Sequence, residues 1–255
     1  MDKDINALKA DIIALQEQNR ALQERMAEMQ LDIDARFATK AYVSTFVEHM
    51  LGDIIPVDTP LTEESPIAGY VPLDIERIEK HFGRAQQYYN SVDWRTILTN
   101  YDNAAKRGNI NPYIAIAQMV KETDWGRSFW SRRPQRNPAG IGVTGQWSIE
   151  DPRTPDNRNV WAFNTDRNRW EYGYSFPSWE ISAQAHIGHL LTYLYKQSTL
   201  TEDQVALVAI DPRSKAVSDK VRGTIKLLKD LDGKWAVPGL NYGRSIATLA
   251  NALKQ

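Results

Sequence analysis

The sequence contains no cysteine among its 255 residues. This absence excludes a disulfide scaffold, a thiolate metal site and a cysteine nucleophile. The chain also has no excess charge of either sign, because 31 Lys and Arg residues stand against 32 Asp and Glu residues. The overall charge therefore argues against a nucleic-acid partner and against a basic membrane binder.

Long apolar runs are missing as well. No run of about 18 apolar residues is present to span a bilayer. The first six residues, Met-Asp-Lys-Asp-Ile-Asn, have neither the basic start nor the apolar centre of a signal peptide. We therefore expect no membrane span and no signal peptide. The Gly-x-Ser-x-Gly elbow of serine hydrolases is absent too.

Apolar residues recur with a period of seven in the N-terminal segment. One series consists of Ile5, Ile12, Asn19, Met26 and Ile33, and the other, three residues later, of Leu8, Leu15, Leu22, Met29 and Arg36. Ile in the first series, Leu in the second and the lone Asn19 favour a parallel two-stranded coiled coil, although trimers tolerate the same pattern. We predict a homo-oligomer, dimer or trimer, formed through residues 5–36. The alternative is an amphipathic helix packed on its own globular domain, but the segment runs for nearly five heptads without Gly or Pro.

The following segment is rich in proline, with four prolines between residues 52 and 72. Such a composition predicts a semi-extended linker. We therefore divide the chain into a coiled-coil helix over 1–37, a short helix and Pro-rich linker over 38–72, and a catalytic domain over 73–255.

The domain over 73–255 is mainly helical by its apolar periodicity and capping residues. Helices are predicted over 73–82, 94–106, 112–125, 177–195, 201–209, 214–231 and 242–253. Residues 140–175 are rich in Thr, Trp, Val, Asn and Asp and predict loops with a small hairpin. The fold class is therefore mainly α, an α+β domain with a small β excursion.

The segment 115–128 places one carboxylate, Glu122, near the end of an apolar helix. Helical spacing puts Gln118, Glu122 and Trp125 on one stripe, so the acid and an aromatic ring can share one wall of a cleft. Gly126 is a natural residue to end the helix. The C-terminal end of a helix disfavours negative charge and so favours the protonated form that a general acid needs. On these residues alone, a surface Glu in a last helical turn is the alternative.

Two further motifs follow in order. Residues 137–145 read Asn-Pro-Ala-Gly-Ile-Gly-Val-Thr-Gly, and residues 176–186 begin Phe-Pro-Ser-Trp-Glu-Ile-Ser. Together with 115–128, this order resembles the glucosaminidase family of peptidoglycan hydrolases, glycoside hydrolase family 73. The resemblance covers residues 93–195, with a further likeness to phage-encoded wall hydrolases over 233–243. Two departures are Ala139, where the family usually has an aromatic residue, and Gly142-Val143, where it usually has a Lys.

The resemblance implies a lysozyme-like glycosidase that degrades the bacterial cell wall. It would act as an endo-β-N-acetylglucosaminidase on the β-1,4 linkages of the peptidoglycan strand, with Glu122 as general acid. Similar enzymes take a second catalytic group from the β excursion, where we choose Asp156 from a set that also contains Glu150, Asp151, Asp166 and Glu171. Alternatively, the N-acetyl group of the substrate supplies its own carbonyl oxygen as nucleophile.

Six tryptophans fall within 55 residues: Trp125, Trp130, Trp147, Trp161, Trp170 and Trp179. Sugar rings pack on aromatic faces, so such a cluster suits a glycan groove, although most of these rings are expected in the core. We expect Gln118, Trp125 and Trp147 to contact substrate. The resemblance adds a tyrosine near the cleaved bond, which is either Tyr193 or Tyr195.

A run of arginines follows the Glu122 helix: Arg127, Arg132, Arg133 and Arg136. This run is either a solvated surface or a patch that suits anionic stem peptides or wall polymers.

No cofactor or metal is implied. The glycines at 140, 142 and 145 match a dinucleotide fingerprint, but neither a strand before them nor a helix after them is predicted. His186 and His189 lie three residues apart on a predicted helix, without a third ligand nearby in the sequence.

The sequence is therefore compatible with two classes of function. The first is the hydrolase; the second is a non-catalytic glycan-binding or structural tail component with a lysozyme-like body. Residues 38–43 resemble junctions in phage tail and fibre proteins. With the heptads, they favour a bacteriophage protein carried in the virion tail, beside other tail proteins, over a lysin released to the bacterial cell wall.

Overall fold

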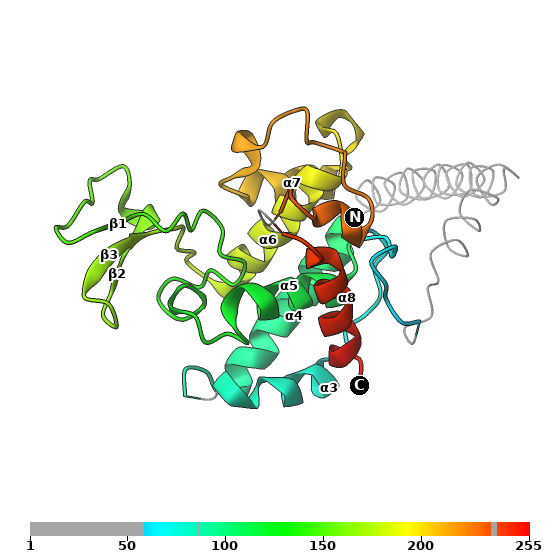
Figure 1. Ribbon diagram of the computed structural model, residues 1–255, viewed down its shortest axis with the longest axis horizontal. Coiled ribbons are helices and arrows are strands. Elements are labelled where there is room, and N and C mark those ends of the chain that lie inside the picture. Colours follow the sequence, from blue (N-terminus) through cyan, green and yellow to red (C-terminus); the bar gives the residue numbers. More distant parts are fainter. Residues whose placement is uncertain (1–58, 86, 236–238) are drawn as a thin grey trace, which may run out of the picture. The chain divides into compact units, whose positions relative to one another are not determined.

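The computed structural model describes residues 59–85, 87–235 and 239–255 (Figure 1). The predicted coiled coil over 5–36 and the short helix after it lie outside these residues. Within them, no helix is both long enough and apolar enough to cross a membrane.

The centre of the described body is α5 (Pro112–Thr123), in which every residue from Pro112 to Val120 is buried. The Asn111 side chain accepts a hydrogen bond from the Tyr113 amide, and Pro112 occupies the first helical position, so the helix has a defined start. Because α5 is apolar on all sides, its neighbours must cover it. These neighbours are α4 (Ser91–Gly108) and α8 (Tyr242–Leu253).

The other helices complete the helical body around this core. Helix α6 (Trp179–Leu194) packs on α4, α7 (Glu202–Ile210) packs on α6, and α3 (Ile75–Glu79) packs on α4 (Figure 1). Apolar side chains from these helices form one buried cluster. This cluster fixes the position of the C-terminal end of α5, where Glu122 lies.

A small antiparallel sheet forms the β excursion. It contains β1 (Trp147–Ser148), β2 (Trp161–Asn164) and β3 (Arg169–Tyr172), in the order β1-β3-β2. In its register Glu171 lies between Trp147 and Ala162, so these residues share one face of the sheet. The helices with this small sheet confirm the predicted mainly helical, lysozyme-like α+β fold.

The predicted helix over 214–231 is wrong. The segment forms 3₁₀ turns at Ser214–Ala216 and Leu228–Leu231, and an irregular chain joins them. The reason is tertiary: the amide of Ile67 donates to the carbonyl of Lys226, and the amide of Leu228 donates to that of Ser65. These backbone groups pair across the fold, so they are not available for a helical ladder.

The Pro-rich segment also differs from the predicted linker. Leu61, Ile67 and Val71 are buried in the core of the body. The Asn251 side chain bonds both the amide and the carbonyl of Leu61, at 2.7 and 2.8 Å. The packed body therefore begins before residue 73, because the apolar residues between the prolines pack against α8 and its neighbours.

Candidate active site

Helix α5 ends abruptly just after Glu122. Thr123 is its last residue, and Asp124, Trp125 and Gly126 all have left-handed backbones, with φ values of 51°, 59° and 77°. Two consecutive left-handed residues other than glycine are uncommon, and such strain persists where the surroundings enforce it. Here a Cβ on Gly126 would lie 2.5 Å from the Trp94 ring, so the chain passes too close to α4 for any side chain. The turn leaves Glu122 exposed at the end of a buried helix.

One hydrogen bond fixes the exposed carboxyl group. Tyr242, the first residue of α8, donates its hydroxyl proton to Oε1 of Glu122 over 2.7 Å. Burial raises the pKa of Tyr242 far above its ordinary value, and the charge of Glu122 and this hydrogen bond raise it further. The phenol therefore keeps its proton and acts as a donor, while the second oxygen of Glu122 is left for other chemistry.

A buried polar network lies behind this pair. Gln118, one helical turn before Glu122, is wholly buried, and its Oε1 lies 3.3 Å from Nε2 of His186. The other ring nitrogen of His186 lies 2.8 Å from the hydroxyl of Tyr101. Burial lowers the pKa of His186 to about 3, and nearby His189 lowers it further, so the imidazole is neutral at ordinary pH. The network thus joins α4, α6 and α5 without a net charge.

Gln118 also influences Tyr242, because its side chain lowers the pKa of the Tyr242 hydroxyl. Among the described residues, the buried Nε2 of Gln118 has no hydrogen-bond partner within bonding distance. The predicted role of Gln118 as a substrate contact therefore needs correction: a wholly buried amide supports the Tyr242–Glu122 pair from behind and does not reach a substrate.

A glucosaminidase family model, described as mannosyl-glycoprotein endo-beta-N-acetylglucosaminidase, matches residues 98–254. This match spans more than half of the chain and includes Glu122, His186 and Tyr242. The chain belongs to the glucosaminidase family. It is a glycoside hydrolase of the N-acetylglucosaminidase type.

Two solved structures are similar to this glucosaminidase. The catalytic domain of the autolysin Auto from Listeria monocytogenes has 18% identity and a TM-score of 0.36, and the match covers 70% of this chain and 86% of that one. An N-acetylmuramoyl-L-alanine amidase from Staphylococcus aureus has 17% identity and a TM-score of 0.33, with 80% of this chain and 52% of that one covered. No curated protein matches the sequence.

The motif over 137–145, which follows α5, has a structural task. The buried Asn137 side chain donates to the carbonyls of Ile141 and Tyr174, at 2.8 and 2.9 Å, and accepts from the amide of Ile141 at 2.8 Å. Gly142 has a φ of 69°, and a Cβ there would lie 2.5 Å from the Tyr174 ring. Asn137 thus connects the glycine loop, residues 140–145, to the segment that follows β3. These hydrogen bonds hold the loop against the end of the sheet.

The acids of the β excursion fall into two groups. Three of them form ion pairs: Asp151 with Arg153 at 2.8 Å, Asp166 with Arg132 at 3.5 Å and Glu171 with Arg169 at 3.0 Å. Glu150 and Asp156 lie exposed between β1 and β2, Asp156 in a turn, and within the described part of the chain neither makes an ion pair.

Glu171 is the most constrained of these acids. Burial alone would raise its pKa, but hydrogen bonds from Asn164, Arg169 and Arg167 outweigh burial and hold the pKa below its usual value. Its Oε1 accepts from both arginines, at 3.1 Å from Arg167 and 3.0 Å from Arg169. A carboxylate that two arginines hold in its ionised form is poorly suited to donate a proton.

The other residues predicted to contact substrate lie in different parts of the structure. Trp125 packs against Phe82 at 5.8 Å between ring centroids, whereas Trp147 is 53% exposed on the sheet with Arg169 over its ring. Tyr193 packs on His189 and Trp235, and Tyr195 lies under Lys226. The tyrosine that bonds Glu122 is Tyr242, which the sequence reasoning did not select.

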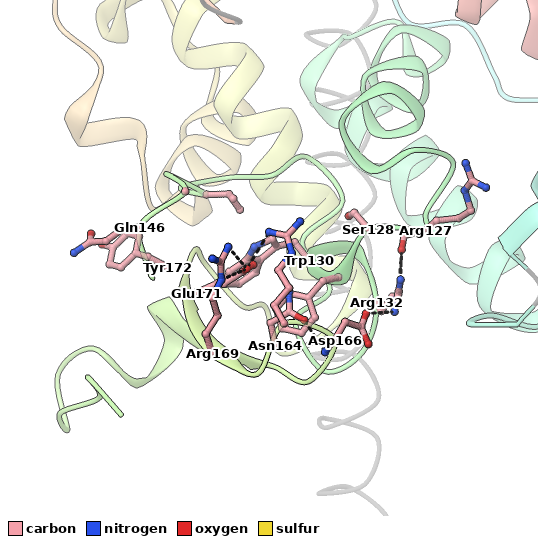
Figure 2. A pocket seen from close by; sticks show the side chains of 14 residues that line it. Arg127, Ser128, Trp130, Arg132, Gln146, Asn164, Asp166, Arg169, Glu171 and Tyr172 are labelled. Carbon is pink, nitrogen blue, oxygen red and sulfur yellow. Dashed lines mark hydrogen bonds and ion pairs between the residues drawn. The ribbon is translucent and has the colours of Figure 1, made fainter. Parts of the chain in front are cut away.

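A cavity of about 420 Å³ begins just beyond the end of α5 (Figure 2). Its walls come from residues 127–132, from the glycine loop and from the β2–β3 hairpin. They include four arginines and two acids: Arg127, Arg132, Arg167, Arg169, Asp166 and Glu171. Figure 2 shows Arg169 beside Glu171 and Arg132 beside Asp166. Glu122 does not line this cavity.

The four arginines that follow α5 do not all face the cavity. Arg127 and Arg132 line the cavity, whereas Arg133 pairs with Asp93 of α4 and Arg136 lies 5.9 Å from the Trp179 ring. Only half of the run can act on a ligand in the cavity.

Proposed function

We propose that the protein is an endo-β-N-acetylglucosaminidase that hydrolyses the β-1,4 linkage after N-acetylglucosamine in peptidoglycan, with Glu122 as general acid. The observation that carries the proposal is the hydrogen bond from Tyr242 to Oε1 of an otherwise exposed Glu122. Because Oε1 is occupied by a donor, the transferable proton belongs on Oε2, which is free to face a glycosidic oxygen.

Tyr242 supports the reaction more strongly in the transition state than before it. As Glu122 gives its proton to the leaving oxygen, negative charge develops on the carboxylate that Tyr242 contacts. A hydrogen bond to a charged acceptor is stronger than one to a neutral acceptor, so the contact strengthens as the bond breaks. This is the differential stabilisation that accelerates a chemical step.

The second catalytic group is Asp156 in this proposal. Its support is an exposed carboxylate in a turn of the β excursion, without the ion pairs that hold Asp151, Asp166 and Glu171. A carboxylate in this role activates a water or stabilises the oxocarbenium-like centre. The rival is participation of the substrate's own N-acetyl oxygen, which would leave Asp156 without a chemical role.

The test compares wild type with Glu122→Gln on purified sacculi. Wild type releases soluble fragments, and the variant does not, because an amide cannot donate the proton. Reducing-end analysis of the muropeptides should show N-acetylglucosamine at the new ends. Equal inactivity of both proteins would instead favour a glycan-binding or structural tail component, and reducing N-acetylmuramic acid would indicate a muramidase.

For its setting, we propose a bacteriophage virion in which residues 5–36 hold two or three copies together in the tail. The support is the heptad pattern, which falls outside the described residues, and the junction-like segment over 38–43. Antibody detection of the chain in purified particles tests this setting. Detection in the lysate alone would favour a released lysin.

A further inference from the structure

The cavity beyond α5 is built as an extension of the catalytic helix. The amide of Ser128 donates to the carbonyl of Thr123 at 2.9 Å, so the wall that starts at Arg127 is tied to the last turn that carries Glu122. The opposite wall is the β2–β3 hairpin. The cavity wall therefore continues directly from the end of the helix that carries Glu122.

The cationic groups of the cavity are held in place before any ligand arrives. Nε of Arg132 donates to the carbonyl of Arg127 at 2.9 Å, and the guanidinium lies 3.5 Å from the Tyr88 ring centroid. Arg167 and Arg169 share one oxygen of the buried Glu171. A guanidinium has five N–H donors, so each of these groups keeps donors for a ligand. Such groups lose little conformational freedom on binding.

The charge of the lining suits an anion. Four arginines stand against the carboxylates of Asp166 and Glu171 in the lining, and Asp124 outside the lining pairs with Arg127. This leaves one positive charge in excess around about 420 Å³. Trp130, Val143 and Tyr172 supply apolar surface between these charges. The cavity thus combines guanidinium groups held in fixed positions with apolar surface that suits small aliphatic groups.

We propose that this cavity binds a carboxylate of the peptide stem, so that the enzyme selects peptide-bearing glycan over stripped glycan. The proposal rests on the function proposed above. In a peptidoglycan strand the free carboxylates belong to the peptide branches, and the sugars are otherwise neutral. A planar carboxylate matches two parallel N–H groups of a guanidinium, and the apolar wall suits alanine methyl groups.

The experiment measures kcat/KM on two substrates made from the same sacculi, after anionic polymers have been removed from both. One keeps its peptide stems, and the other has been stripped of them with an amidase, after which the lactyl carboxylates that the cleavage exposes have been amidated. Wild type should favour the peptide-bearing substrate by about tenfold, the worth of one hydrogen bond to a charged group. The double variant Arg127→Gln/Arg167→Gln removes two of the four arginines from the lining and should bring the ratio of the two kcat/KM values close to one.

The matched control is Arg153→Gln/Arg158→Gln. It removes the same charge from two exposed arginines of the β excursion that do not line the cavity, and its ratio should equal that of wild type. If the double cavity variant unfolds, Arg167→Gln alone serves, because its side chain is 62% exposed and Glu171 keeps Arg169.

Binding to Glu122→Gln protein tests the cavity without catalysis. A pentapeptide with free carboxylates should bind, more weakly at high salt, and its fully amidated counterpart should not. Equal wild-type rates on both substrates, or binding of polyglycerol phosphate in place of the peptide, would overturn the assignment. If wild type cleaves neither substrate, the proposed function fails, and the peptide titration alone decides whether the cavity binds a carboxylate.

Discussion

The hydroxyl of Tyr242 lies 2.7 Å from Oε1 of Glu122, although 120 positions separate the two residues in the sequence. The contact exists because α8 packs on α5 and begins at the level where α5 ends. In the proposed reaction it gives the C-terminal helix a part in the chemistry, since the first residue of α8 touches the proposed acid.

Replacement of Tyr242 by Phe should lower kcat by roughly tenfold to a hundredfold, because a hydrogen bond to a charged group contributes about 1.5–3 kcal/mol. KM should change little, since Tyr242 is only 4% exposed. Steady-state kinetics on solubilised glycan strands measures both constants.

The matched control for this change is Tyr70→Phe. Tyr70 also donates its hydroxyl to a carboxylate, Asp102, at 3.1 Å, but it lies in another part of the body. This control should keep the wild-type kcat. A loss of activity equal to that of Tyr242→Phe would show that the effect is a general loss of stability.

His186 should make the stability of the protein depend on pH. Its folded-state pKa of about 3 lies below the ordinary 6.5, so between these values the unfolded chain binds a proton that the folded protein does not. Stability therefore falls as the pH drops below 6.5, by about 1.4 kcal/mol for each unit. Urea unfolding at pH 6.5 and pH 5 should show a loss of about 2 kcal/mol, by the same conversion.

The His186→Gln variant should lose less than half of that amount over the same interval. The interval lies above the titration of the carboxylates whose pKa values are lowered, such as Glu171 and Asp230. An unchanged slope in the variant would mean that other groups cause the acid sensitivity.

The tautomer of His186 is a second consequence of the same network. Oε1 of Gln118 lies 3.3 Å from Nε2 of His186 and can only accept. This contact requires the proton on Nε2, and the lone pair on Nδ1 then accepts from the Tyr101 hydroxyl. Nitrogen-15 NMR of the imidazole should report this tautomer, and a proton on Nδ1 would reverse the direction of the network.

Local sequence signals predicted much of the helical body. Helices α5 and α8 follow from apolar periodicity, and α5 also from Asn111 and Pro112, whose capping roles the structure shows. Glu122 was predicted as the acid from the family resemblance. The local expectation that Gly126 ends the helix was wrong, because α5 ends at Thr123 and Asp124 is its left-handed cap.

The features that the sequence did not predict depend on contacts between segments that are far apart in the chain. The helix predicted over 214–231 failed because residues 65–67 pair with that stretch, which no local pattern indicates. Tyr242 lay in a segment noted for its likeness to other wall hydrolases, but its contact with Glu122 arises only from the packing of α8. Only two of the four arginines line the cavity because the chain turns between Arg132 and Arg136. The spacing of apolar residues in the sequence does not predict this turn.

Gly126 should tolerate no side chain. Gly126→Ala places a Cβ at 2.5 Å from the Trp94 ring at a φ of 77°, so both steric overlap and left-handed strain oppose it. Gly140→Ala is the control, because its φ is 62° but no atom lies within 4 Å of the added Cβ. The control should lose about 1 kcal/mol from strain alone, and Gly126→Ala should lose clearly more, together with activity, as thermal unfolding and hydrolysis assays would show.

The heptads predict a change of oligomeric state. Leu15→Lys with Leu22→Lys places two charges in the predicted seam of each helix, where they would be buried against the same charges of another copy. Light scattering should give the mass of a dimer or trimer for the wild-type chain and of a monomer for the variant. The same substitutions at Ala14 and Ala21, which face away from the predicted seam, should leave the mass unchanged. A monomeric wild type would remove the coiled coil from the proposal.

Asp156→Asn decides between the two proposed sources of the second catalytic group. If Asp156 activates water or stabilises the developing positive charge, kcat should fall by about a hundredfold or more, the usual effect of losing such a group. Glu150→Gln is the control, because it removes a second exposed acid of the same excursion and should leave kcat unchanged. A wild-type kcat in Asp156→Asn would assign the role to the N-acetyl oxygen of the substrate, and a substrate analogue without that carbonyl should then be cleaved by neither protein.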